Sequence, residues 1–139
     1  MITTDELKNL PYLQQEIDWN RKRIEQLKNP QRLKGIPPAH VQGYAAVLTE
    51  DIELCQEQIQ RCTAQLEKLR DFVNGINDPF TRELFRLRYE CGKEWATVFD
   101  IMYEKGYHYA DEGSLRKICG RYLKRYNDAD ERTRQKCVL

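Results

Sequence analysis

The sequence has few of the residues that break regular structure. Seven glycines and five prolines are spread over 139 residues, and turns need such residues at particular positions. A chain with so few of them favours long elements over many short ones. No segment shows the strict alternation of apolar and polar residues that predicts a strand. We therefore expect an all-α fold.

Long apolar runs are also missing. None approaches the roughly 20 residues that a membrane-spanning helix requires, and the opening MITTDELKNL lacks the basic start and apolar centre of a signal peptide. These absences predict a cytoplasmic protein with no membrane partner. The five cysteines form no C-x-x-C pair, and His40 and His108 lie far apart. We expect no disulfide framework, no metal and no cofactor.

Sequence signatures of catalysis are not found either. There is no glycine-rich phosphate loop, no H-E-x-x-H and no G-x-S-x-G. The chain has one serine, Ser114, at a position typical of a helix cap. Acidic residues alternate with basic ones at helical spacing, as on a solvated face. We therefore expect no catalytic residues and a protein that is not an enzyme.

Two heptad runs dominate the first half of the chain. Apolar residues recur at alternating steps of three and four, which predicts two coiled-coil-like helices. The segment NPQRLKGIPPAHVQGY separates them and contains three prolines and two glycines, so the chain is expected to turn back. The prediction for residues 1–74 is an antiparallel helical hairpin. Its pairing seam comprises Leu10, Leu13, Ile17, Asn20, Ile24, Leu27, Leu48, Ile52, Cys55, Ile59, Cys62, Leu66 and Leu69, with Ala45 and Val73 completing the second run.

Three details of this hairpin are expected from local chemistry. Asn9 can cap the first helix, which puts Pro11 in the first turn, where its missing N–H costs little. Residues 1–8 would then form a separate short helix or fray. Asn20 is either a register-setting polar contact or a tolerated interruption. Cys55 and Cys62 are interpreted as small buried hydrophobes.

A break at NGINDPF separates the hairpin from a second helical region, residues 78–127. Asp78 and Pro79 are a typical cap and first residue. A first helix ends at Gly92, and a second ends at Gly106. The third begins near Asp111 or Ser114 and is expected to end near Tyr126, leaving residues 128–139 as a polar tail. The expected buried residues are Phe80, Leu84, Leu87, Trp95, Val98 and Met102, with Cys91 uncertain and Phe99 and Ile101 at the border.

The last of these helices carries an unopposed positive charge. LRKICGRYLKRY contains five cations and no acid in a chain whose net charge is +1. On a helical wheel, Leu115, Ile118, Cys119, Tyr122 and Tyr126 gather on one side. Lys117, Gly120, Arg121 and Lys124 lie opposite, with Arg116 and Arg125 on the flanks. Gly120 would allow another backbone to approach closely. This pattern indicates double-stranded DNA as a partner, although a solvated basic face would look the same.

The order of the helices strengthens the interpretation that the basic helix binds DNA. DPFTRELFRLRYECGKEWATVFDIM followed by SLRKICGRYLKRY resembles region 4 of bacterial sigma factors, a helix-turn-helix whose second helix enters the major groove. The tryptophan after RYECGKE and the N-terminal hairpin resemble, more specifically, small phage-encoded sigma-like regulators of the ArpU and RinA kind. The resemblance implies control of phage late genes. It also brings in Arg82, Arg86 and Arg88, which either touch phosphates or pair with nearby glutamates.

One departure from that family concerns the turn YEKGYHYADEGS, which is longer than usual by about six residues and carries three tyrosines. We expect Tyr107 or Tyr109 to be buried. Two other functions stay open: an adaptor or RNA polymerase-binding protein, and a phage packaging component. The predicted DNA-binding residues are Ser114, Arg116, Lys117, Arg121, Lys124, Arg125 and Arg88. Because helix one is too short to cover helix two, we also expect a homodimer through residues 10–73.

Overall fold

The computed structural model describes the backbone of residues 1–138 and the side chains of residues 1–137. Throughout this part of the chain the regular structure is helical, as the sequence predicts. Five α-helices are joined by two short 3₁₀ turns, Pro30–Leu33 and Pro38–His40, and by a π-helical turn, Arg86–Glu90. The α-helices are α1 (Thr4–Lys28), α2 (Val41–Asn74), α3 (Pro79–Phe85), α4 (Trp95–Glu104) and α5 (Glu112–Val138).

The chain divides into two compact units. Tyr12–Glu67 form the first, which we call the helical-pair unit, and Met1–Pro11 together with Lys68–Leu139 form the second, the discontinuous unit. This division differs from the predicted ranges 1–74 and 78–127, because both ends of the predicted hairpin belong with the C-terminal helices. The reason is packing: Ile2, Leu7 and Leu10 are buried, and so are Leu69 and Val73.

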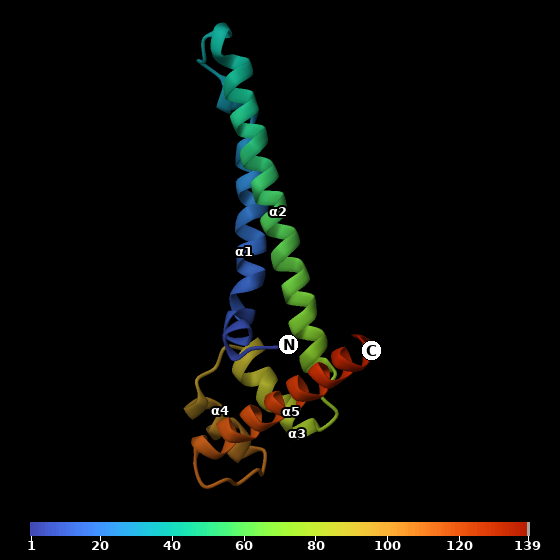
Figure 1. Cartoon of the computed structure of the whole chain (residues 1–139). Coiled ribbons are helices and arrows are strands. Elements are labelled where there is room, and N and C mark those ends of the chain that lie inside the picture. The colour runs from blue at the N-terminus through green and yellow to red at the C-terminus, as the bar shows by residue number, and fades with distance from the viewer. Residues whose placement is uncertain (139) are drawn as a thin grey trace. The chain divides into compact units, whose positions relative to one another are not determined.

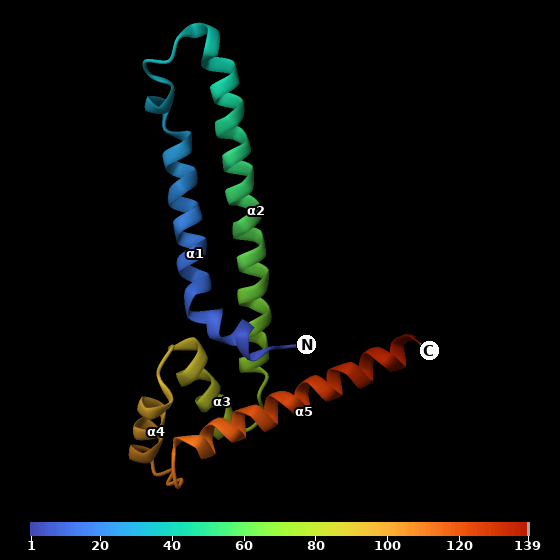
Figure 2. The same cartoon turned by 60° about the vertical axis from the view of Figure 1, so that its left-hand side comes forward.

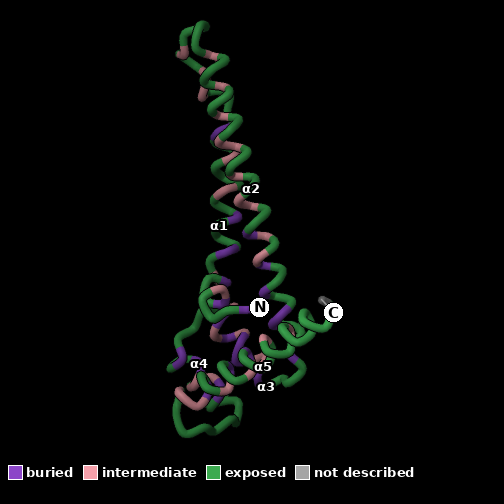
Figure 3. The backbone as a smooth tube through the Cα atoms, viewed as in Figure 1, coloured by how far each residue is buried: buried purple, intermediate pink, exposed green. Residues whose placement is uncertain are grey.

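Within the helical-pair unit, α1 and α2 lie side by side and run in opposite directions (Figures 1 and 2). After α1, Asn29 caps the 3₁₀ turn Pro30–Leu33, because its side-chain oxygen accepts a hydrogen bond from the Gln31 N–H at 3.0 Å. Of the predicted seam residues, five in this unit are buried, namely Leu13, Ile17, Leu27, Cys62 and Leu66, and Leu10 and Leu69 are buried in the discontinuous unit. The other six, Asn20, Ile24, Leu48, Ile52, Cys55 and Ile59, are half-buried. Two helices alone therefore leave part of the seam open to water (Figure 3).

The discontinuous unit contains the main core. Phe85 is fully buried, and its ring centroid lies 5.4 Å from Phe72, 5.6 Å from Tyr89 and 5.8 Å from Tyr122. Such offset and edge-on ring pairs add to the burial of apolar area. Leu84, Trp95, Val98 and Met102 complete the packing of α3 and α4 and confirm the predicted inward faces of both helices. Cys91 is exposed and Phe80 is half-buried, so neither belongs to this core.

Local signals for helix ends are confirmed. The Asp78 carboxylate accepts hydrogen bonds from the Thr81 N–H and hydroxyl, at 3.2 and 2.6 Å, and Pro79 is the first residue of α3. The hydroxyl contact is the main reason that the pKa of Asp78 is lowered. Gly92 and Gly106 have positive φ angles of 67° and 97°, which explains why glycine ends both segments.

Two helix boundaries were predicted wrongly. The sequence places the start of α1 at Asn9, but the helix begins at Thr4. Thr3 explains this, because its hydroxyl oxygen accepts a hydrogen bond from the Glu6 N–H at 3.1 Å, as an N-cap threonine does. The Thr3 hydroxyl also donates to the Glu6 carboxylate at 3.2 Å. Pro11 thus lies inside the helix.

The predicted end of α5 is also wrong, because the helix continues to Val138 and does not end near Tyr126. A reciprocal pair of contacts supports the extension: the Ile2 N–H donates to Asn127 Oδ1 at 2.9 Å, and Asn127 Nδ2 donates to the Ile2 carbonyl at 2.8 Å. The Met1 ammonium group also lies 3.1 Å from Asp130 Oδ2. The predicted tail is therefore helical over its described residues.

Candidate nucleic-acid interface

The candidate interface is built on the first half of α5, and an aspartate fixes where that helix begins. The Ser114 N–H and hydroxyl both donate to Asp111 Oδ1, at 2.9 and 3.1 Å. These two contacts lower the pKa of Asp111, and the hydrogen bond from the Ser114 N–H has the larger effect. The sequence predicted that this helix begins near Asp111 or Ser114, and the structure shows that Asp111 caps it. Ser114, predicted to contact DNA, is half-buried and its hydroxyl is engaged in this cap.

One face of α5 packs into the discontinuous unit. Leu115, Cys119 and Leu123 are buried, and Ile118 and Tyr122 are half-buried. Tyr126 is 39% exposed even though its ring centroid is 4.7 Å from that of Phe72. Leu123 was missing from the predicted inward face. Its position one turn beyond Cys119 on the same stripe is the signal that could have found it.

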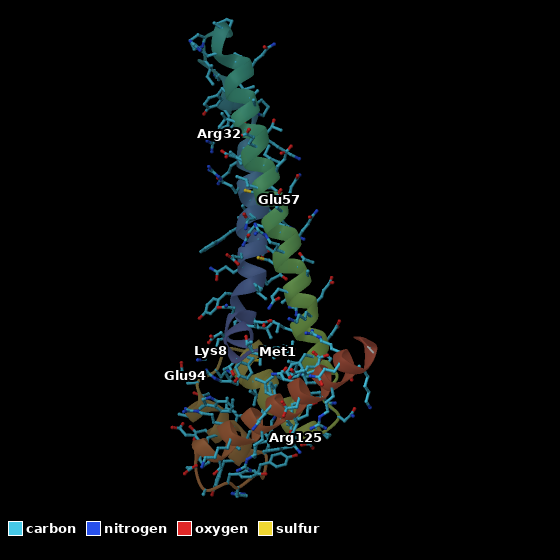
Figure 4. All side chains as sticks on the ribbon, viewed as in Figure 1. Met1, Lys8, Arg32, Glu57, Glu94 and Arg125 are labelled. Carbon is cyan, nitrogen blue, oxygen red and sulfur yellow. The ribbon has the colours of Figure 1, made fainter. Side chains whose placement is uncertain are left out.

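The opposite face of α5 carries exposed cations. Arg116, Lys117, Arg121, Lys124 and Arg125 are all exposed, and Arg125 is labelled on this helix in Figure 4. Within the described part of the chain, none of the five forms a salt bridge, whereas Lys68, Arg86, Lys105 and Arg134 all do. We call these five residues the α5 cationic face.

The α5 cationic face has sharp ends. Glu112 precedes it and Asp128 follows it, and no acidic residue lies between them. Fifteen residues of helix span about 22 Å at 1.5 Å per residue. Beyond that stretch, the second half of α5 mixes acids with bases, as Asp130 and Arg134 show by pairing at 3.4 Å. The unopposed charge is therefore confined to about four turns.

Gly120 lies in the middle of this face and has no packing role. A Cβ built on it would meet no neighbouring atom within 4 Å, and its φ is not in the left-handed region. A glycine inside a helix costs about 1 kcal/mol relative to alanine. No contact within residues 1–137 requires the missing side chain, so close approach by another molecule is a consistent reason for it.

Arg88 and Arg82 are used inside the protein. Arg88 Nη1 donates to the Lys93 carbonyl at 3.0 Å, and its guanidinium carbon lies 5.6 Å from the centroid of the Trp95 ring. Its buried Nε has no hydrogen-bond partner among the residues that the structure describes. Arg82 Nη1 donates to the Ile76 carbonyl at 2.9 Å. Both side chains therefore hold loops in place, and we leave Arg88 out of the α5 cationic face.

The long turn between α4 and α5 exposes its tyrosines. The rings of Tyr107 and Tyr109 lie against Phe80, with centroids 4.8 and 5.3 Å apart, yet they remain 42% and 39% exposed. The prediction that one of them is buried is wrong. Tyr103, 51% exposed, lies edge-on to His108 at 4.2 Å. The physical reason is that the Tyr107 and Tyr109 rings pack on Phe80, which is itself only half-buried, and do not enter the core.

Neither a metal site nor a membrane span was found. Among residues 1–137, no three His, Cys, Asp or Glu side chains are grouped closely enough to hold a metal ion. No helix in the described part of the chain is long and apolar enough to cross a membrane. No family model, curated protein or solved structure matches the sequence or the fold.

Proposed function

We propose that this protein is a DNA-binding transcriptional regulator that reads duplex DNA with α5. In this proposal α3, the π-helical turn, α4 and α5 form a sigma-region-4-like helix-turn-helix, and α1 and α2 form a coiled-coil-like hairpin. The sequence resemblance extends the proposal to a phage or prophage regulator of late genes. The observation that carries it is the α5 cationic face.

Three features support this assignment. The face carries five unpaired charges on a helix whose other side is anchored in a core, so the charges are held in fixed register. A helix with its side chains is about 10–12 Å across, and the major groove is about 12 Å wide. The cationic face, about 22 Å long, can therefore lie along the groove. Contacts to phosphates supply most of the affinity of such proteins, and Lys117, Arg121 and Lys124 project from the side opposite the core.

The acidic residues at the start of α5 limit how the helix can approach DNA. Asp111 is held by Ser114 and so faces its own helix end, whereas Glu112 is exposed. A carboxylate there repels phosphates. We therefore propose that the middle of the helix, from Lys117 to Lys124, makes the closest contact and that the turn stays clear of the duplex.

Charge reversal tests the proposal. Duplexes selected from a random pool by the parent protein serve as the probe. Lys117→Glu with Lys124→Glu should weaken binding at least about tenfold, or about 1.4 kcal/mol. The log–log dependence on salt should also become less steep by about 0.9 for each phosphate that the variant no longer neutralises.

A matched control lies on the same helix. Arg132→Glu with Lys136→Glu changes the net charge by the same amount at two exposed positions that lie outside the cationic face. This variant should bind the selected duplexes nearly as well as the parent. If both pairs weaken binding equally, the effect is one of net charge. If neither pair does, α5 is not the DNA-binding element.

A second candidate function rests on the exposed tyrosines of the long turn. Tyr107 and Tyr109 in the turn and Tyr103 at the end of α4 are exposed, and we treat them as one aromatic surface whose sequence neighbours include the acids Glu104 and Glu112. Such a surface fits a protein partner with basic residues, including RNA polymerase. Tyr103→Ala with Tyr109→Ala should abolish co-purification with polymerase and leave DNA binding intact, whereas the charge reversal in α5 should have the opposite effects.

A further inference from the structure

The helical-pair unit exposes large apolar side chains on one side. Five residues of this unit are exposed although they are aromatic or aliphatic: Tyr12, Trp19, Tyr44, Val47 and Leu54. Trp19 is 62% exposed and Leu54 60%. Single exposed apolar residues are ordinary on protein surfaces, so their arrangement decides what they mean.

The heptad register puts all five on the same face. If the seam residues are positions a and d, Tyr12, Trp19, Val47 and Leu54 fall at c and Tyr44 at g. In an antiparallel helix pair the g positions of the two helices border the same side of the seam, and the c positions lie beside them. We call this side of residues 12–67 the c/g face. The other side, at positions b and e, has Ala46 as its one apolar residue.

The charges on the c/g face balance. They are Glu16 and Asp51 against Arg23 and Arg61, and none of the four forms a salt bridge within the described residues. Glu16 does accept a hydrogen bond from the Cys62 thiol at 3.3 Å. A net charge of zero gives DNA nothing to bind. A second copy would bring the same two acids and two bases, so each charge can meet one of opposite sign.

The size of the face suits a stable dimer. Within this unit α2 extends for about 40 Å and α1 for about 25 Å, and each helix is about 10 Å wide. The face thus offers on the order of 650 Å² per copy, or about 1,300 Å² for two copies, which lies within the range of about 1,200–2,000 Å² for specific interfaces. The half-buried seam residues Ile52, Cys55 and Ile59 also need more cover than one helix provides.

We propose that the c/g face is a homodimer interface, in which a second copy packs face to face and completes a four-helix layer. A two-fold axis makes such an interface self-complementary, and four-helix packing buries seams that a helix pair leaves open. The proposal does not depend on DNA binding, and its test contains no DNA, so either can fail without the other.

The test compares mass in solution for matched variants of the full chain. Across the micromolar range, the parent should have twice the 16.6 kDa of one chain in light scattering or sedimentation. Trp19→Glu with Leu54→Glu should lower the mass to that of one chain while the circular dichroism stays helical. Gln15→Glu with Gln60→Glu adds the same two carboxylates at exposed positions off the c/g face, and this chain should remain a dimer.

Iodide quenching of the parent provides a second readout that needs no substitution. The chain has two tryptophans, and because Trp95 is buried, quenching reports Trp19. The accessibility of Trp19 should fall over the concentration range in which the mass doubles. A dimer whose Trp19 stays accessible would pair through another surface, and a monomer at every concentration would leave this face to a different partner. Either result overturns the proposal.

Discussion

At the scale of single residues, burial controls the chemistry of the cysteines. Desolvation raises the pKa of the Cys119 thiol to about 12. The pKa of Cys62 is also raised, first by burial and then by its hydrogen bond to Glu16. Cys91 and Cys137 are exposed. Because the thiolate is the reactive form, the four residues should react at very different rates.

Thiol labelling checks this expectation. At about pH 8, a colorimetric disulfide reagent should modify Cys91 and Cys137 rapidly, because both thiols are exposed. Cys119 should stay unmodified until denaturant is added, and raising the pH towards 9 should change little, since its folded pKa is higher still. Rapid labelling of Cys119 in the folded chain would show that the inner face of α5 opens readily. A Cys91→Ser, Cys137→Ser chain removes the two exposed thiols and leaves the half-buried Cys55 and the buried Cys62 and Cys119.

Residues whose role is set by near neighbours are those that sequence predicts well. Asp78, Pro79, Gly92 and Gly106 act within a few residues of their own positions, and each was found where local chemistry expects it. Burial of Tyr107 depends on how far the turn folds over Phe80, which no local pattern encodes. This is why the caps were predictable and the tyrosines were not.

At the scale of elements, the long turn between α4 and α5 contributes less to stability than the core does. Tyr107→Ala removes a ring that stays 42% exposed and makes one close ring contact, which is worth about 0.5–1.5 kcal/mol. Phe85→Ala removes a fully buried ring and should cost about 3–5 kcal/mol. Urea unfolding followed by circular dichroism measures both. Equal losses of stability would mean that the turn is part of the core after all.

Helix ends set by distant contacts explain the errors at this scale. The extension of α5 past Tyr126 depends on Asn127 bonding to the backbone of Ile2, a residue at the other end of the chain. Sequence periodicity also weakens there, because DADERTRQK has no apolar stripe. For the candidate site, periodicity identified the cationic face of α5, whereas the internal roles of Arg82 and Arg88 required the structure.

At the scale of the whole molecule, burial along the seam is uneven. Leu13 and Ile17 on α1 and Cys62 and Leu66 on α2 are buried, but Leu48, Ile52 and Cys55 are half-buried. Helix stability in proteins comes mainly from packing of an amphipathic face, so local opening should follow this difference.

Hydrogen exchange tests that expectation. Backbone amides of residues 44–56 should exchange faster than those of residues 61–74, because segments with less buried apolar surface open at lower free energy. The Trp19→Glu, Leu54→Glu chain removes any protection that comes from pairing. Uniform protection along α2 in that chain would show that the helix opens as one unit.

The discontinuous unit also has a consequence for biosynthesis. Ile2 contacts Asn127 across 125 positions of sequence, and Met1–Pro11 share a unit with residues that begin at Lys68. A ribosome releases residues 12–67 as one continuous stretch, so that segment can fold while the rest is still being made. The opening residues must instead wait for α5, and closing so long a loop is entropically slow. Residues Met1–Pro11 are thus synthesised well before their native partners, and they reach those contacts late.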